Sequence, residues 1–154
     1  MSREQIVRCA GTDPRRRLET FPSFSGKGVD AMKDLEEILQ RAYSARDEQD
    51  LLDLYSSWSG SFDKDVVERL GYRGHEICAH GLLRHFDDRK GAVLDVGCGT
   101  GLVGQVLARE GFRNVDGLDL SREMLEKARE KMVYRRLVEA DLNRPLDIPD
   151  DAYG

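Results

Sequence analysis

The feature that most constrains the fold of this chain is the stretch over residues 93–101, which reads VLDVGCGTG. A short apolar run that contains an acid is followed by three glycines at alternate positions. Apolar residues then recur at helical spacing over residues 102–107, so the pattern predicts a strand, a glycine loop and a helix. Because the first N–H groups of a helix have no partner within it, we expect a site for a nucleotide-like ligand at this loop.

Two more strands are predicted downstream, over residues 114–120 and 134–140; Asp119 lies near the end of the first and Asp141 directly follows the second. Between them, Ser121 can cap a helix whose apolar residues recur at helical spacing. Strands that alternate with helices predict parallel β–α–β units with right-handed crossovers. We therefore expect an α/β fold with a Rossmann-like sheet, of which this chain contains the first three parallel strands.

The part of the chain before this sheet has a different character. Residues 1–29 are rich in charge and in turn-forming residues and predict a mobile tail. Residues 30–90 show helical periodicity and predict a helical lead-in with a lid, including a capping box over residues 44–47. Residues 91–154 would then form the first half of a cofactor-binding domain. For the aromatic segment 55–63, a ligand-covering flap and simple packing onto the main domain are equally favoured.

The predicted sheet is incomplete. Three parallel strands with two crossover helices make half of a doubly wound sheet. We expect the chain to be either a fragment of a longer protein or a natural short product whose sheet another chain completes. An open parallel edge exposes unpaired backbone groups, so self-association through this edge is also expected.

Composition narrows the classes of partner and compartment. A length of 154 residues fits one domain with a real core, and a net charge of −5 disfavours a nucleic-acid partner. No apolar run approaches the roughly 20 residues that span a bilayer, and the N-terminus lacks the apolar segment of a secretory signal. These features favour the cytoplasm, with the nucleus as the alternative. No C-x-x-C pair is present, and the three histidines would point apart on a helix, so no metal site is predicted.

Two registers compete for the glycine loop. Counted from Gly99, the sequence fits G-x-G-x-x-G with Asp119 20 residues further on, which is the dinucleotide fingerprint. That register places Asp95 and Gly97 inside the strand, where both residue types are unfavourable. Counted from Gly97, the strand ends just after Asp95, and the acid lies at the carboxyl edge of the sheet, where ligands of open α/β sheets bind. We prefer the second register.

At this point the residues resemble a known family. Residues 93–101 are similar to the first motif of the class I S-adenosylmethionine-dependent methyltransferases, residues 119–125 to the second motif and residues 139–142 to the third. Three motifs in the right order are a far more specific signal than one glycine loop. The aromatic segment of residues 55–72 also resembles the lead-in of the Williams–Beuren-region methyltransferase-like proteins. The resemblance covers roughly residues 47–154.

The resemblance implies S-adenosyl-L-methionine as the cofactor and a set of residues that contact it. These are Tyr55, Trp58, Asp95, Gly97, Cys98, Gly99, Gly101, Asp119, Leu120, Met124, Asp141 and Leu142. It also implies that the glycine loop packs against the methionine part of the cofactor, with Asp95 at the base of the loop. Asp119 would accept hydrogen bonds from both ribose hydroxyls, a bidentate task that suits a carboxylate.

The remaining residues would enclose the cofactor. Leu120 and Met124 are expected to pack on the face of the adenine, and Asp141 to accept from its amino group with Leu142 beside it. The two aromatic residues of the lead-in would close over the cofactor. These roles follow from the resemblance to the family.

The function that the resemblance implies is transfer of a methyl group, most simply to a small molecule. The sulfonium makes the methyl group electrophilic, so alignment and exclusion of water supply much of the rate. No catalytic residue can be named, because acceptor-side residues in this family come from segments beyond the third strand. Two other hypotheses stay open, an NAD-dependent oxidoreductase and a truncated, non-catalytic product that binds a partner.

Overall fold

The computed structural model describes residues 7–8 and 29–153 of the chain, with side chains from Leu35 onward. Backbone contacts divide the chain into two compact units, with the boundary between Leu54 and Tyr55. The described part of the first unit is residues 29–54. The second unit contains the sheet and everything that follows Leu54.

The first unit consists of helix α1 (Val29–Ser44) and most of helix α2 (Glu48–Trp58). Helix α2 starts with a reciprocal cap, in which the Asp50 N–H donates to the Asp47 carboxylate over 2.9 Å. The Asp50 carboxylate in turn accepts from the N–H of the residue before Asp47, over 3.0 Å. The capping residue is therefore Asp47, and the box predicted to start at Ser44 is wrong by three residues. A carboxylate is favoured at this position because it also complements the partial positive charge of the helix start.

The second unit is built on a four-stranded parallel sheet with the strand order β1-β2-β3-β4. Its strands are β1 (Val7–Arg8), β2 (Val93–Val96), β3 (Val115–Asp119) and β4 (Arg136–Glu139). Strands β2, β3 and β4 are the three predicted parallel strands, and each begins and ends within two residues of the predicted bounds. The Rossmann-like α/β fold is thus confirmed.

Strand β1 lies within the predicted N-terminal tail and is an addition to the predicted sheet. It pairs with one edge of β2, with Val7 opposite Asp95 and Arg8 opposite Val96. The structure therefore differs from the tail prediction at these two residues. Residues 1–6 and 9–28 lie outside the described residues, and the tail stays a prediction for them.

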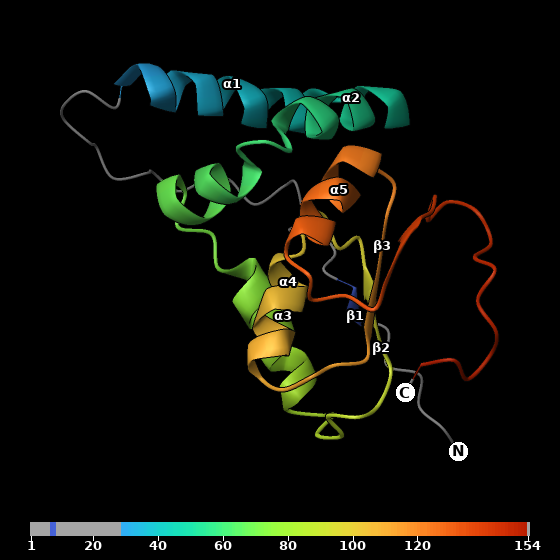
Figure 1. Ribbon diagram of the computed structural model, residues 1–154. Coiled ribbons are helices and arrows are strands. Elements are labelled where there is room, and N and C mark those ends of the chain that lie inside the picture. The colour runs from blue at the N-terminus through green and yellow to red at the C-terminus, as the bar shows by residue number, and fades with distance from the viewer. Residues whose placement is uncertain (1–6, 9–28, 154) are drawn as a thin grey trace. The chain divides into compact units, whose positions relative to one another are not determined.

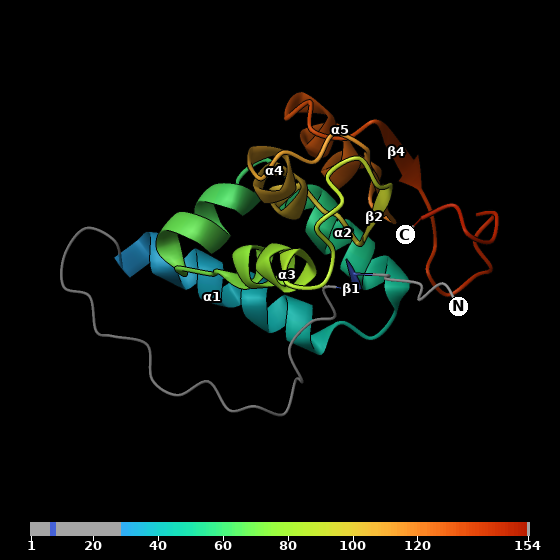
Figure 2. The ribbon, with the colours of Figure 1, turned by 90° about the horizontal axis from the view of Figure 1, so that it is seen from below.

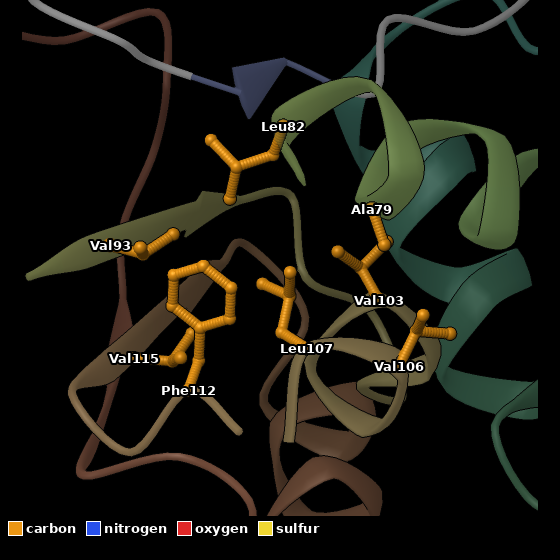
Figure 3. Close-up of a cluster of buried hydrophobic side chains, with 8 residues drawn as sticks. All are labelled: Ala79, Leu82, Val93, Val103, Val106, Leu107, Phe112 and Val115. Carbon is orange, nitrogen blue, oxygen red and sulfur yellow. The ribbon is translucent and has the colours of Figure 1, made fainter. Parts of the chain in front are cut away.

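Three helices cover one face of this sheet. Helices α3 (Gly74–Leu83), α4 (Leu102–Arg109) and α5 (Arg122–Glu130) lie on the same side of β2 and β3 (Figure 1). Right-handed crossovers between successive parallel strands place α4 and α5 on this common face. The main core lies between the sheet, α3 and α4 (Figure 3). Its buried residues are Ala79, Leu82, Val93, Val103, Val106, Leu107, Phe112 and Val115.

The other face of the sheet is covered by the segment that follows β4. This segment leaves β4 at the edge of the sheet and contains no helix or strand up to residue 153 (red in Figures 1 and 2). Its apolar side chains cover a second, smaller cluster of buried strand residues. The cluster consists of Leu94, Val96 and Leu118, packed against Ala140, Ile148 and Tyr153.

A short π-helix, η1 (Lys64–Arg69), connects α2 with α3. Asp63 directly precedes η1, but its carboxylate makes no capping hydrogen bond. The Asp63 side chain instead contacts Thr100 of the glycine loop, which brings the residue before η1 to the candidate site.

Candidate cofactor-binding site

The glycine loop connects β2 with α4 and follows directly on Val96. Gly97, Gly99 and Gly101 have φ angles of 73°, 52° and 90°, a region that side chains with a Cβ rarely adopt. Each glycine is therefore required by the backbone path of the loop. Because β2 ends before Gly97, the register counted from Gly97 is confirmed, and the register that extends the strand to Gly99 is wrong.

The two sides of this loop differ in what lies against them. Among the described residues, and apart from its chain neighbours, a Cβ built on Gly97 or Gly99 would meet no atom within 4 Å. A Cβ on Gly101 would lie 2.9 Å from the Tyr134 ring, and one on Gly104 would lie 2.4 Å from it. One side of the loop is thus open to a ligand, and the other is packed against Tyr134.

Asp119, the last residue of β3, binds the loop through both carboxylate oxygens. Its Oδ2 accepts from the Gly99 N–H over 2.8 Å, and its Oδ1 accepts from the Ser121 N–H over 2.9 Å. Ser121 caps α5 as predicted, since its hydroxyl accepts from the Met124 N–H over 3.3 Å. Each carboxylate oxygen of Asp119 keeps a second lone pair for a further donor.

Asp95 lies on β2 beneath the loop and is 2% exposed. Its Oδ2 accepts from the Tyr134 hydroxyl over 2.6 Å, whereas Oδ1 is buried with no hydrogen-bond partner among the described residues. Burial raises the pKa of Asp95 to about 6, the Tyr134 hydrogen bond opposes this increase, and the charge of Asp119 adds to it. A carboxylate with one free buried oxygen is costly to the fold, which suggests a role in binding.

Cys98 shapes the loop from within. Its thiol is buried beneath the loop, 2.9 Å from the position that a Cβ on Gly117 of β3 would occupy. Its N–H donates to the Leu118 carbonyl, and its own carbonyl accepts from the Gly101 N–H. Burial and the nearby carboxylates of Asp95 and Asp119 raise the pKa of the thiol well above its usual value, so it stays protonated. The N–H, the carbonyl and the thiol of Cys98 therefore all contact other residues of the chain.

The third motif lies beside Asp119. The Ala140 N–H donates to the Asp119 carbonyl over 2.9 Å, which places the end of β4 next to the end of β3. The Asp141 carboxylate accepts from the Asn143 N–H over 2.8 Å and pairs with Arg144 over 2.9 Å. Leu142 is 52% exposed and thus free to cover a ligand.

The residues of the second motif differ in exposure. Leu120 is half-buried, whereas Met124 is 2% exposed in the first turn of α5. The acids of the three motifs lie at or near the carboxyl ends of β2, β3 and β4, which is the edge at which open α/β sheets bind ligands.

The aromatic residues of the lead-in form a cluster of their own. The ring centroids of Tyr55 and Trp58 are 6.3 Å apart, and Phe62 packs edge-on against Trp58 at 4.8 Å. Trp58 is buried and donates its indole N–H to Asp65 over 2.8 Å. Packing within the lead-in is thus observed, and closure of Tyr55 and Trp58 over a cofactor stays a prediction.

Two polar contacts join the lead-in to the site. The Ser56 hydroxyl donates to Glu123 in the first turn of α5, over 2.6 Å. Further along, Asp63 accepts from the Thr100 hydroxyl in the glycine loop and from Lys131 at the end of α5, over 2.6 Å for the lysine. Lys131 also donates to the Thr100 carbonyl over 2.6 Å, so the three side chains hold the loop, the lead-in and α5 together.

Sequence reasoning missed Asp63, Thr100, Lys131 and Tyr134 as residues of the site. Their partners are 30 to 68 residues away in the chain, and no local pattern relates them. The one available signal was a large aromatic residue, Tyr134, two residues before β4.

Comparison with known proteins agrees with this geometry. Residues 93–154 match the family model of the methyltransferase domain. The match begins at the first residue of β2, and it includes the glycine loop, Asp119 and Asp141. The match thus covers the part of the chain that contains the three motifs.

Several methyltransferases are similar to this chain. Methyltransferase-like protein 27 of Homo sapiens is 34% identical over 125 residues, which are 77% of this chain and 51% of that protein. Ubiquinone biosynthesis O-methyltransferase of Neisseria meningitidis is 41% identical over 64 residues, 42% of this chain and 24% of that enzyme. Protein arginine N-methyltransferase 1 of Schizosaccharomyces pombe is 41% identical over 78 residues, 49% of this chain and 21% of that enzyme.

Residues 93–154 thus form part of a methyltransferase domain, and the parallel sheet, the glycine loop and these matches support the class I S-adenosylmethionine-dependent type that the three motifs predict. The family predicted from the three motifs is confirmed. The oxidoreductase hypothesis depended on the register counted from Gly99, and that register is wrong because β2 ends at Val96. The chain spans about half the length of methyltransferase-like protein 27 and less of the other relatives.

Two further observations concern metal ions and membranes. Among the described residues, no group of three or more His, Cys, Asp or Glu side chains is arranged to hold a metal ion. Within the same part of the chain, no helix combines the length and the apolar character required to cross a membrane.

Proposed function

We propose that this chain binds S-adenosyl-L-methionine at the glycine loop and contributes to the transfer of its methyl group to a small-molecule acceptor. The observation that carries the proposal is the open side of the loop at Gly97 and Gly99, directly beside the Asp119 carboxylate. The glycine backbone, which has no side chains, leaves room for the polar methionine part of such a ligand. The fixed carboxylate of Asp119 suits its ribose.

Three properties of the residues fit this cofactor. The open glycines allow close approach of the methionine part. Asp119 is held by two N–H groups and still has lone pairs for two ribose hydroxyls. Asp95 has a buried oxygen that lacks a donor among the described residues, and a positively charged amino group of the ligand would supply one.

The adenine would lie next to the second and third motifs. Leu120 and Met124 would provide apolar contacts, and Asp141 would accept from the adenine amino group. The contact between Ala140 and Asp119 supports this arrangement, because it keeps the two motifs side by side. The exposed side chain of Leu142 would be covered on binding.

The lead-in would close the site through Tyr55 and Trp58. The bonds of Ser56 with Glu123 and of Asp63 with Thr100 support this role, because they attach the lead-in to the two elements that border the loop. A cover of this kind excludes water from the reacting groups.

When bound, the cofactor supplies an electrophilic methyl group on a sulfonium, so the protein mainly has to align the acceptor and exclude water. The name of the ubiquinone biosynthesis relative supports a small-molecule acceptor, whereas another relative is named as a protein arginine N-methyltransferase. The net charge of −5 makes nucleic acid the least favoured acceptor.

We also propose a cytoplasmic location, with the nucleus as the alternative, and self-association through the edge of β2. The sequence supports both, and in the described part of the chain β1 pairs with two of the four β2 residues on that edge. A fluorescent fusion tests the location, and light scattering over a range of concentrations tests the association.

Calorimetric titration with S-adenosylhomocysteine and, separately, with NADH tests the central part of the proposal. We expect binding of S-adenosylhomocysteine, loss of that binding in Asp119→Ala, and unchanged binding in the control Asp147→Ala, whose side chain is exposed in the C-terminal segment. Binding of NADH alone would contradict the proposal. A folded chain that binds neither ligand would instead support the non-catalytic product.

A further inference from the structure

We propose that Tyr134 is a positioning residue of the cofactor site, whose single hydroxyl fixes the glycine loop, the start of α4 and the Asp95 carboxylate relative to one another. This inference rests on the proposed function. Tyr134 lies outside the three motifs that carry the family resemblance, just before β4. It contacts the loop from the side opposite the open face.

The Tyr134 ring occupies space that three glycines leave free. A Cβ on Gly101, Gly104 or Gly117 would lie 2.9 Å, 2.4 Å and 3.1 Å, respectively, from atoms of this ring. These glycines belong to the loop, to α4 and to β3, so the ring is enclosed by all three elements. In such close packing the ring has little freedom, and the position of its hydroxyl is fixed.

The hydroxyl completes the start of α4. Gly101, the N-cap residue, has no side chain that could satisfy the first N–H groups of the helix. The Gly104 N–H instead donates to the Tyr134 oxygen over 3.2 Å. Tyr134 therefore acts as the cap of a helix that begins 32 residues earlier in the chain.

The same hydroxyl donates its hydrogen to Asp95 over 2.6 Å. Burial and the nearby Asp95 charge raise the pKa of Tyr134 far above its usual value, so the hydroxyl keeps this hydrogen and remains a donor. One oxygen of Asp95 is thereby held in place, and the other stays free for a donor from the cofactor. The hydroxyl thus links β2 to α4 through two hydrogen bonds of opposite direction.

Ionisation of Asp95 gives this arrangement a measurable signature. Among the described residues, the titratable groups that face Asp95 are Tyr134, Asp119 at the end of β3 and Cys98 in the loop. The pKa of Asp95 is about 6, and the Tyr134 hydrogen bond lowers it against burial and the Asp119 charge. Removal of the hydroxyl should therefore raise the Asp95 pKa further. Protonated Asp95 cannot attract an ammonium group, so ligand binding should weaken as the pH falls through this pKa.

The first experiment compares Tyr134→Phe with Tyr153→Phe in the full 154-residue chain without ligand. Tyr153 is a matched control, because its hydroxyl also donates to a buried aspartate, Asp116, over 2.8 Å, but on the other face of the sheet. Carboxyl ¹³C NMR against pH should show the Asp95 titration moving to higher pH in Tyr134→Phe only. Exchange of the Gly104 amide hydrogen should accelerate in the same variant.

The second experiment measures S-adenosylhomocysteine affinity by calorimetry between pH 6 and pH 8. Wild type and Tyr153→Phe should lose affinity only near the lower limit. Tyr134→Phe should bind about fivefold more weakly than wild type at pH 6, with the difference decreasing toward pH 8. A loss that is equal at every pH, with an unchanged Asp95 titration, would overturn the proposal because it would indicate a purely structural role.

A second variant covers the case in which Tyr134→Phe fails to fold. Asp95→Asn should remove the pH dependence of ligand affinity between pH 6 and pH 8, and persistence of that dependence would overturn the proposal. If wild type binds no S-adenosylhomocysteine, the proposed function fails by itself. The carboxyl titration then decides on the link between Tyr134 and Asp95, since it requires no ligand.

Discussion

Two buried carboxylates on neighbouring parallel strands, Asp95 of β2 and Asp116 of β3, are held in opposite ways. They are 2% and 1% exposed, and each accepts from a tyrosine hydroxyl, Tyr134 at 2.6 Å and Tyr153 at 2.8 Å. Asp95 has no other partner among the described residues, and one of its oxygens stays free.

Asp116 is fully satisfied by charged donors. Arg135 binds both of its oxygens, over 2.9 Å and 2.5 Å, and Arg136 adds a longer contact of 3.2 Å. Burial raises the pKa of Asp116, but the hydrogen bonds from Arg135 and Tyr153 outweigh burial and lower it. For Asp95, in contrast, burial dominates and the pKa is raised to about 6.

The difference separates an acid that stabilises the fold from an acid kept available for a ligand. Asp116 lies in the interior of β3 and faces the C-terminal segment, whereas Asp95 lies two residues before Gly97, the first residue of the glycine loop. An unsatisfied buried carboxylate weakens the folded state, and such groups persist where binding requires them. Substitution of Asp116 should therefore mainly lower the stability of the fold, whereas substitution of Asp95 should change properties that depend on its ionisation and on the ligand.

The largest effect on stability is expected for Asp116→Ala. Loss of the carboxylate leaves Arg135, Arg136 and Tyr153 without their common partner, and we expect the free energy of unfolding to fall by about 3 kcal/mol in urea titrations. S-adenosylhomocysteine affinity should stay within about twofold of wild type. A stable Asp116→Ala that no longer binds the ligand would reverse the assignment of the two acids.

The next effect is a change in the pH dependence of stability in Asp95→Asn. The pKa of Asp95 is raised on folding, so its contribution is most favourable below about pH 4 and is lost as the pH rises through about 6. Asparagine cannot titrate. Relative to wild type, Asp95→Asn should therefore gain about 2 kcal/mol of stability between pH 4 and pH 7, as urea unfolding at both pH values would measure. A constant difference would show that Asp95 does not titrate in this window.

A smaller effect tests the packing that sets Tyr134 apart from Tyr153. Gly104→Ala places a Cβ 2.4 Å from the Tyr134 ring, and we expect a loss of about 1.5 kcal/mol in thermal or urea unfolding. Gly81→Ala in α3 is the matched control, because among the described residues no atom outside the backbone of its own helix lies within 4 Å of the added Cβ. The control should be stabilised by about 0.5 kcal/mol, since alanine is the better helix residue. Equal effects in both variants would mean that Tyr134 is not enclosed as described.

The smallest effect ranks the two arginines that bind Asp116. Arg135 forms a two-point contact with the carboxylate, whereas Arg136 forms one longer contact and is 63% exposed. We expect Arg135→Ala to lower the urea midpoint more than Arg136→Ala, and neither to affect ligand affinity. A larger loss in Arg136→Ala would contradict this ranking.

Much of the sheet and the loop could be predicted from the sequence, because their signals are local. The apolar run before Gly97, the alternate glycines and the helical period after them define β2, the loop and α4 within about 20 residues. The Ser121 cap is also local, and Asp119 follows from its place at the end of the next strand.

The contacts that complete the site could not be predicted in this way. The bond between Tyr134 and Asp95 spans 39 residues, and that between Lys131 and Asp63 spans 68. Such pairs depend on how strands and helices register in space, which the period of apolar residues does not specify. Asp116 was missed for a related reason, because an acid inside a strand gives no sign of partners that meet it only in the sheet.

The central claim is that the ligand binds at the edge marked by Asp95 and Asp119 and leaves the surroundings of Asp116 untouched. Amide chemical shifts of the chain, followed by NMR during titration with S-adenosylhomocysteine, test it most directly. The account predicts large shifts at Gly97, Gly99 and Ser121, and none at Arg136. Shifts confined to the residues around Asp116, or no shift at all at saturating ligand, would contradict it.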